Sequence, residues 1–149
     1  MNKFKAVGSV QGSSAPDPVK PNLRVLVVDD DLDTVHSLAM LIKSFGHHPD
    51  FAINTLAAID VARRFRPDVV VLDINLPDFS GETLARQLKF EPGFEKLRII
   101  ALSGRSDDET RQRALEAGCE AFYVKPLAPE TLERYLAGEA PYSRGGRAA

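Results

Sequence analysis

The chain has 149 residues, 44% of them hydrophobic and 27% charged, with a formal net charge of −2. These are the proportions of one ordinary globular domain with a sizeable core, and so small a net charge gives no sign of affinity for nucleic acid or an anionic membrane. A single cysteine, Cys119, excludes an internal disulfide and is typical of a reducing compartment. No stretch has the composition of a signal peptide or a membrane span, so we expect a cytoplasmic protein.

The chain begins with a segment that lacks the pattern of folded structure. Residues 1–21 are rich in Gly, Ser, Pro and Lys with little apolar periodicity, which predicts a disordered leader or linker. Residues 139–149 are similar in character and are expected to form a flexible tail, far too short for a DNA-binding domain. The folded domain is therefore predicted to span 22–138.

Within this domain, short apolar runs alternate with amphipathic segments. The predicted strands, in chain order, are residues 23–28, 48–53, 68–73, 97–103 and 121–124. The predicted helices are 32–45, a segment between the cap Asn54 and Pro67, a segment following Gly81, a segment between a Ser106 and Glu109 capping box and Gly118, and 129–136. This alternation indicates right-handed crossovers and an α/β fold, with a parallel sheet covered by helices on both faces.

Two of the helices have a predicted contact surface. The second is expected to bury one face, made up of Leu56, Ile59, Ala62 and Phe65. The fourth has Leu115 as its only large apolar residue, with Ala114 and Ala117 beside it. With so few apolar anchors, the fourth helix is expected to be held weakly and to be able to move.

Polar residues follow four of the five predicted strands at their carboxyl ends. Asp29 and Asp30 follow the first strand, Asp73 ends the third, Ser103 ends the fourth, and Lys125 follows the fifth. Taken singly, each has a simpler explanation as a helix cap, a turn residue or a surface lysine. Because ligands of doubly wound sheets bind beyond the carboxyl ends of the strands, their conjunction at one edge predicts a functional site.

The chemistry that this set of residues permits is narrow. Clustered carboxylates repel one another, so a cation is needed to hold them together. Oxygen ligands favour Mg²⁺, whereas the lack of His or Cys at any strand end disfavours zinc. His47 and His48 lie in a turn without a spaced third ligand and are interpreted as structural. A carboxylate beside Mg²⁺ and a lysine can act as a nucleophile toward phosphorus.

The segments LRVLVVDDD, VVVLDINLPDFSG, IIALSGR and YVKPL resemble the motifs of the response-regulator receiver family of two-component signalling. The resemblance covers residues 23 to about 137, with the motifs in the family's order and spacing. It implies a flavodoxin-like sheet with strand order 2-1-3-4-5. It also implies Mg²⁺ as cofactor and a phosphoryl donor that is a histidine kinase or a histidine phosphotransfer protein of a phosphorelay.

The resemblance also implies roles for individual residues. Asp73 would be the phosphoacceptor and Lys125, joined to Pro126 by a cis peptide bond, would bind the phosphoryl group. The implied metal ligands are Asp30 directly, Asp29 largely through water, Asp73, and the backbone carbonyl of Asn75. Ser103 and Phe122 would form the switch, and a downstream protein would bind the face formed by the fourth helix, fifth strand and fifth helix.

Other functions are compatible with parts of this pattern. The leader leaves open a receiver domain from a hybrid histidine kinase. A phosphohydrolase with an aspartyl nucleophile is disfavoured, because its Asp-x-Asp motif would require a second Asp where Asn75 stands. An unphosphorylated scaffold does not explain the complete acidic set. We therefore predict a signalling phosphoacceptor rather than an enzyme, one that assists only its own phosphorylation and dephosphorylation.

Overall fold

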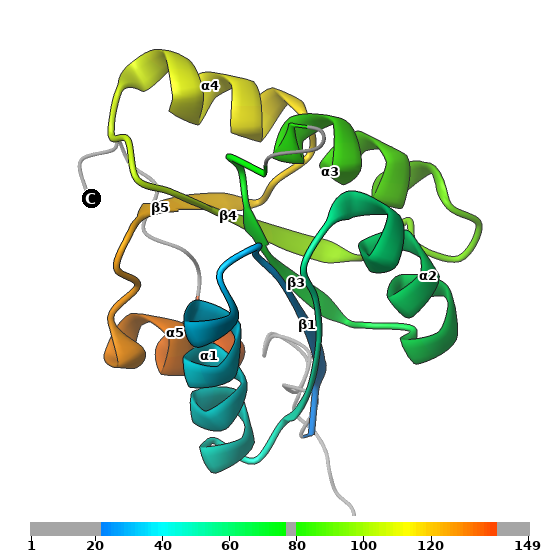
Figure 1. The fold of residues 1–149 in the computed structure, drawn as a ribbon, viewed down its shortest axis with the longest axis vertical. Coiled ribbons are helices and arrows are strands. Elements are labelled where there is room, and N and C mark those ends of the chain that lie inside the picture. Colours follow the sequence, from blue (N-terminus) through cyan, green and yellow to red (C-terminus); the bar gives the residue numbers. More distant parts are fainter. Residues whose placement is uncertain (1–21, 77–79, 140–149) are drawn as a thin grey trace, which may run out of the picture.

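The computed structural model describes residues 22–76 and 80–139, so the predicted leader and nearly all of the predicted tail lie outside the described residues. Strands and helices alternate along the chain (Figure 1). In order they are β1 (Arg24–Val28), α1 (Leu32–Ser44), β2 (His48–Ala52), α2 (Thr55–Phe65), β3 (Val69–Asp73), α3 (Gly81–Phe90), β4 (Arg98–Ser103), α4 (Asp108–Glu116), β5 (Ala121–Val124) and α5 (Pro129–Leu136). In the part of the chain described, no helix is both long and apolar enough to cross a membrane.

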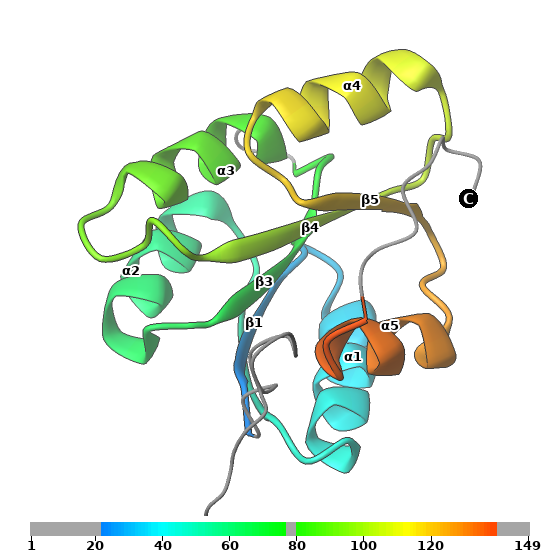
Figure 2. The same cartoon turned by 180° about the vertical axis from the view of Figure 1, so that it is seen from behind.

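The strands form one parallel sheet in the order β2-β1-β3-β4-β5. Helices α1 and α5 cover one face of this sheet, and α2, α3 and α4 cover the other (Figures 1 and 2). This arrangement confirms the predicted flavodoxin-like α/β fold and its strand order.

The core consists of two apolar layers, one on each face of the sheet. Alternate residues of a strand point to opposite faces, so Val25 and Val27 of β1 pack toward α1 and α5 while Leu26 and Val28 pack toward α2 and α3. All five residues of β3 are buried, as expected for a central strand covered on both sides. The central strands thus form a rigid frame whose carboxyl ends share one edge.

The helix boundaries follow mostly from local signals. Asn54 caps α2 by accepting a hydrogen bond from the Ala57 N–H at 2.8 Å, and Pro129 opens α5 as predicted. The predicted Ser106 and Glu109 capping box at α4 is wrong. Asp107 caps this helix instead, accepting from the Thr110 N–H at 2.7 Å, because an Asp is an equally good cap and its charge favours the positive end of the helix dipole.

The predicted contact face of α2 is right except at Leu56. Ala62 is buried, and Ile59 and Phe65 are half-buried and pack against the apolar layer. Leu56, by contrast, is 73% exposed. The helix also buries three residues outside the predicted face, Thr55, Ala58 and Val61. Small side chains such as Ala58 let a helix lie close against a sheet, so packing added them to the buried face.

The anchoring of α4 also differs from the prediction. Leu115 is only half-buried and belongs to neither apolar layer, whereas Ala114 and Ala117 are buried and pack toward the sheet. A salt bridge of 2.9 Å joins Arg113 of α4 to Glu82 of α3. Helix α4 is therefore attached by small side chains and a surface ion pair, and no large side chain of the helix itself is fully buried.

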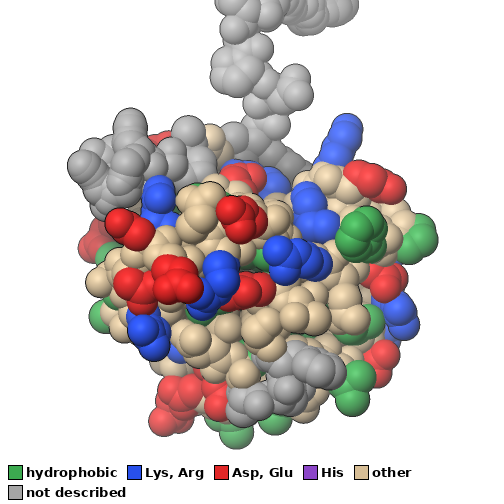
Figure 3. Space-filling view, turned by 90° about the horizontal axis from the view of Figure 1, so that it is seen from above, with side chains coloured by type: hydrophobic (Ala, Val, Ile, Leu, Met, Phe, Trp, Pro, Cys, Tyr) green, Lys and Arg blue, Asp and Glu red, His purple; other side chains and the backbone are tan. Residues whose placement is uncertain are grey.

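Charged side chains of both signs lie interspersed on the face seen from above in Figure 3. Arg113 of α4 pairs with Glu109 in its own helix at 3.2 Å as well as with Glu82 of α3. Some of the surface charges near α4 are therefore engaged in ion pairs.

Candidate functional site

The parallel sheet brings the polar residues that follow its strands to one edge. Asp29 continues β1 beyond its last residue, and its N–H donates to the Ala52 carbonyl at 3.1 Å. Lys125 continues β5 in the same way, donating its N–H to the Ser103 carbonyl at 2.8 Å. Because a backbone hydrogen bond to the neighbouring strand holds each residue, the backbone positions from which both side chains extend are fixed at the carboxyl edge.

The Lys125 side chain bridges two carboxylates from different strands. Its Nζ lies 3.0 Å from Asp29 Oδ2 and 3.2 Å from Asp73 Oδ2. The Lys125–Pro126 peptide bond is cis, as predicted. This one ammonium group therefore joins the ends of β1, β3 and β5.

Three carboxylates gather at this point. One oxygen each from Asp29, Asp30 and Asp73 lies within 4.8 Å of the others. Asp29 and Asp73 are buried and Asp30 is exposed. An all-oxygen set that is open to solvent on one side fits a hard divalent cation such as Mg²⁺, which keeps several water ligands.

The surroundings of Asp73 oppose its ionisation. Burial raises the pKa of this carboxyl, and the neighbouring Asp29 charge raises it further. Two groups lower the pKa by less: the Asn75 N–H, which donates to Asp73 Oδ1 at 2.9 Å, and Lys125. Burial lowers the pKa of Lys125, but its bonds to Asp29 and Asp73 outweigh this effect and leave that pKa raised. A charged Lys125 between two buried carboxylates thus offsets part of their repulsion, and an added cation would offset more.

The acidic run after β1 divides between the cluster and helix α1. Asp31 caps α1, where its carboxylate accepts from the Asp33 N–H at 3.3 Å and the Thr34 hydroxyl at 2.7 Å. Its own N–H donates to Asp29 Oδ1 at 2.9 Å. Asp31 therefore serves the helix and orients Asp29, while Asp29 and Asp30 are the members of the run that face Asp73.

Ser103 lies fully buried at the end of β4, next to the cluster. Its hydroxyl accepts from the Arg105 N–H at 3.0 Å and donates to the side-chain carbonyl of Asn75, Oδ1, at 3.2 Å. Sequence reasoning assigned Asn75 a backbone role and missed this side-chain contact. No local signal could have revealed it, because the two residues are 28 positions apart.

Phe122 is half-buried on β5, opposite Ala101 of β4. Its ring packs against the apolar layer beneath α2, α3 and α4. It therefore lies on the same face of the sheet as α4, one strand away from Ser103.

Two of the histidines, His47 and His36, make structural contacts. His47 accepts the Leu23 N–H on its Nδ1 at 2.9 Å, and burial lowers the pKa of its imidazole. His36 forms an edge-to-face contact with the ring of Phe51, their centroids being 5.9 Å apart.

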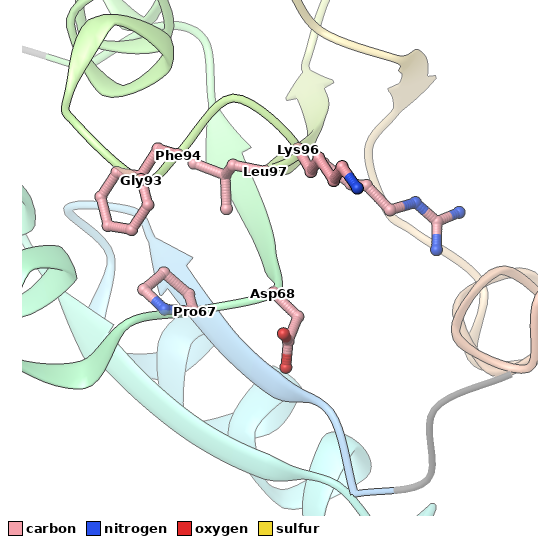
Figure 4. Close-up of a pocket in the computed structure, with 7 residues that line it drawn as sticks. Pro67, Asp68, Gly93, Phe94, Lys96 and Leu97 are labelled. Carbon is pink, nitrogen blue, oxygen red and sulfur yellow. The ribbon is translucent and has the colours of Figure 1, made fainter.

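A separate cavity of about 250 Å³ opens at the opposite edge of the sheet, where β3 and β4 begin (Figure 4). It is lined by Pro67, Asp68, Gly93, Phe94, Lys96, Leu97 and Arg98. None of these residues belongs to the carboxylate cluster, so the cluster and not the cavity is the candidate functional site.

Known proteins share this fold and these motifs. The model of the response regulator receiver domain family matches residues 25–137. The polar-differentiation response regulator DivK of Brucella anthropi is 31% identical over 116 residues, which cover 75% of this chain and 94% of DivK. The transcriptional regulatory protein PrrA of Mycobacterium leprae is 38% identical over 104 residues, which cover 70% of this chain but only 44% of PrrA.

A solved structure shows the same architecture. The chemotaxis response regulator CheY4 of Vibrio cholerae, at 25% sequence identity, matches with a TM-score of 0.72 over 76% of this chain and 95% of CheY4. The family match spans all five strands apart from Arg24 of β1, and it includes the whole carboxyl edge described above. The chain belongs to the response regulator receiver domain family.

Proposed function

We propose that this receiver domain, bounded by residues 22 and 138, takes a phosphoryl group from a phosphohistidine onto Asp73. The observation that carries this proposal is the ammonium group of Lys125, held 3.0 Å from Asp29 and 3.2 Å from Asp73 at the edge where three carboxylates meet. An anion of high charge density that enters this site is attracted by the positive charge of Lys125 and by that of any cation bound to the carboxylates.

In the transfer, one carboxylate oxygen of Asp73 attacks the phosphorus atom of the donor. The new P–O bond forms as the P–N bond to the donor's imidazole breaks, and the imidazole, already protonated on its other ring nitrogen, leaves as the neutral base. Mg²⁺ held by Asp29, Asp30, Asp73 and the Asn75 backbone carbonyl would supply positive charge to the phosphoryl oxygens. Lys125 exchanges its bond to Asp73 for one to a phosphoryl oxygen and keeps its bond to Asp29.

The cluster supports different roles for Asp29 and Asp30. Both oxygens of Asp29 are already hydrogen-bonded, Oδ1 to the Asp31 N–H and Oδ2 to Lys125. Asp30 is exposed at the rim of the cluster. We therefore assign direct metal binding to Asp30, and binding largely through water to Asp29.

Phosphorylation of Asp73 changes the surface that includes α4. The Ser103 hydroxyl moves to donate to the phosphoryl group, and Phe122 turns into the space that this opens. Helix α4 then shifts with little loss of packing, because its buried contacts are made by small side chains. The altered face of α4, β5 and α5 then binds a downstream protein. The donor is a cytoplasmic histidine kinase or histidine phosphotransfer protein, and the domain catalyses no reaction beyond its own phosphorylation and dephosphorylation.

The test is covalent labelling of the purified protein with phosphoramidate, a small P–N donor, in the presence of Mg²⁺. Intact mass should rise by one phosphoryl group, and the label should be lost in alkali as an acyl phosphate is. Asp73→Asn should abolish the label, while the control Asp108→Asn, on exposed α4, should retain it. Label that persists in Asp73→Asn would place the acceptor elsewhere and refute the proposal.

A further inference from the structure

The buried hydroxyl of Ser103 has a single proton, and that proton already forms a hydrogen bond. Ser103 is fully buried and donates to Asn75 Oδ1 at 3.2 Å. Its oxygen also accepts from the Arg105 N–H at 3.0 Å, which helps to fix the position of the hydroxyl. The hydroxyl is therefore oriented toward the Asn75 side chain by two hydrogen bonds.

We propose that the Asn75 carboxamide is a latch that holds Ser103 in the resting position and sets the free-energy cost of activation. This inference rests on the proposed function, since the competing acceptor is the phosphoryl group on Asp73. Asn75 acts here as a positioning residue through its side chain, a role separate from that of its backbone carbonyl.

The competition follows from the geometry of the segment after β3. The Asn75 N–H donates to Asp73 Oδ1 at 2.9 Å, so the backbone of Asn75 is tied to the acceptor residue itself. The Asn75 side chain and a phosphoryl group on Asp73 would thus approach Ser103 from the same segment. One hydroxyl proton serves one strong acceptor at a time, so Ser103 must leave Asn75 before it can donate to the phosphoryl group.

The size of the effect follows from the value of one neutral, partly buried hydrogen bond. Such a bond contributes about 1 kcal/mol net, which corresponds to a factor of about five in an equilibrium constant. Removing the latch should therefore raise the affinity for a phosphoryl mimic by about fivefold, because the resting state loses a bond that the activated state has already given up.

The test is a double-mutant cycle with Asn75→Ala and Ser103→Ala, measured as affinity for beryllofluoride in the presence of Mg²⁺. We expect Asn75→Ala to bind the mimic about fivefold more tightly than the unmodified protein, because the latch is gone. In the Ser103→Ala background the same change should have no effect. Asn75→Leu, which keeps the shape of the side chain without its acceptor, should match Asn75→Ala.

A second readout needs neither metal nor mimic. In the absence of both, the unfolding equilibrium constant is measured for the unmodified protein, the two single alanine variants and the double variant. The coupling between Asn75 and Ser103 should be about fivefold in this constant. Absence of this coupling would overturn the latch, since the bond would then contribute nothing in the resting state.

The outcomes separate this inference from the proposed function. If Asn75→Ala gives an equal gain in affinity with Ser103 present and in the Ser103→Ala background, Asn75 acts directly on the anion or the metal, and the latch alone is overturned. Beryllofluoride binding that is absent from the unmodified protein, or unchanged by Asp73→Asn, would overturn the proposed function and the latch with it.

Discussion

Gly81 is the position at which a single added methyl group should disturb both the fold and the site. It is the first residue of α3, it is buried, and its N–H donates to the Ile74 carbonyl at 3.0 Å. A Cβ at this position would lie 2.6 Å from Ile74 Cα and 2.8 Å from the Asp73 carbonyl oxygen. These are backbone atoms of the segment that carries Asp73, so they cannot rotate away as a side chain could.

The cost of Gly81→Ala can be estimated from this contact. To reach an ordinary contact of 3.4 Å, α3 and the segment after β3 must separate by roughly 0.8 Å. Overpacking of this kind costs about 1–3 kcal/mol, and a collision with backbone belongs at the upper end of that range. The better helix propensity of alanine returns up to about 1 kcal/mol. We therefore expect a net loss of about 2 kcal/mol in the free energy of unfolding.

The same displacement should weaken the site. A shift of Asp73 relative to Asp29 and Lys125 separates groups whose roles depend on sub-ångström placement, so we expect Mg²⁺ affinity to fall by about tenfold. Urea denaturation measures the stability, and calorimetric titration measures the metal affinity. The matched control is Gly104→Ala, since a Cβ at this exposed glycine beside Ser103 would meet no atom within 4 Å.

The result for Gly81 can refute the reasoning clearly. If Gly81→Ala and Gly104→Ala unfold at the same urea concentration, the close approach between α3 and the Asp73 segment does not limit the fold. If Gly81→Ala loses stability but keeps full Mg²⁺ affinity, the strain is absorbed by α3 and not by the segment that holds Asp73.

Two further predictions concern the cluster and the half-buried His47. Asp30→Ala should weaken Mg²⁺ binding more than Asp29→Ala in a calorimetric titration, because Asp29 is already engaged by Lys125 and the Asp31 N–H; equal losses would contradict the ranking. Burial holds the pKa of His47 below its ordinary value of 6.5, so the unfolded chain binds more protons and stability should fall as pH drops through 6.5. Urea midpoints measured at several pH values should show this loss of stability in the unmodified protein and in the control His36→Asn, but not in His47→Asn. If His47→Asn shows the same loss, another group causes the pH dependence.

Much of the fold could be predicted because its signals are local. Every strand but β2 is a short apolar run and each helix has a cap or a breaker, so the order of elements and the parallel sheet follow from the sequence. The strand order 2-1-3-4-5 came from the resemblance to a family rather than from periodicity. The carboxyl edge was predictable for a geometric reason, since parallel strands bring their carboxyl ends together. That rule alone placed Asp29, Asp73 and Lys125 near one another.

Which face of a helix is buried was decided by tertiary packing. In α2, Leu56 shares the helical spacing of Ile59 and Phe65, yet it is 73% exposed while they pack against the apolar layer. The smaller Ala58 and Val61, which lie outside the predicted face, are buried. In α4, Ala114 and Ala117 are buried while the larger Leu115 is half-exposed. Hydrophobicity ranks single residues, whereas packing depends on the space between two elements, and that space exists only in the folded chain.

The sequence by itself determined which chemical groups this protein brings to its site, and the tertiary structure decided what each group contacts. The sequence placed a carboxylate, a hydroxyl and a lysine at the strand ends. Only in the folded chain does the Ser103 hydroxyl donate to Asn75 and the Asp31 carboxylate cap α1. Only there does Gly81 lie so close to Ile74 that a side chain would collide with the backbone. The physical reason is that hydrogen bonds and steric contacts are set by distances of a few ångströms between backbones, and a pattern of residue types does not specify such distances.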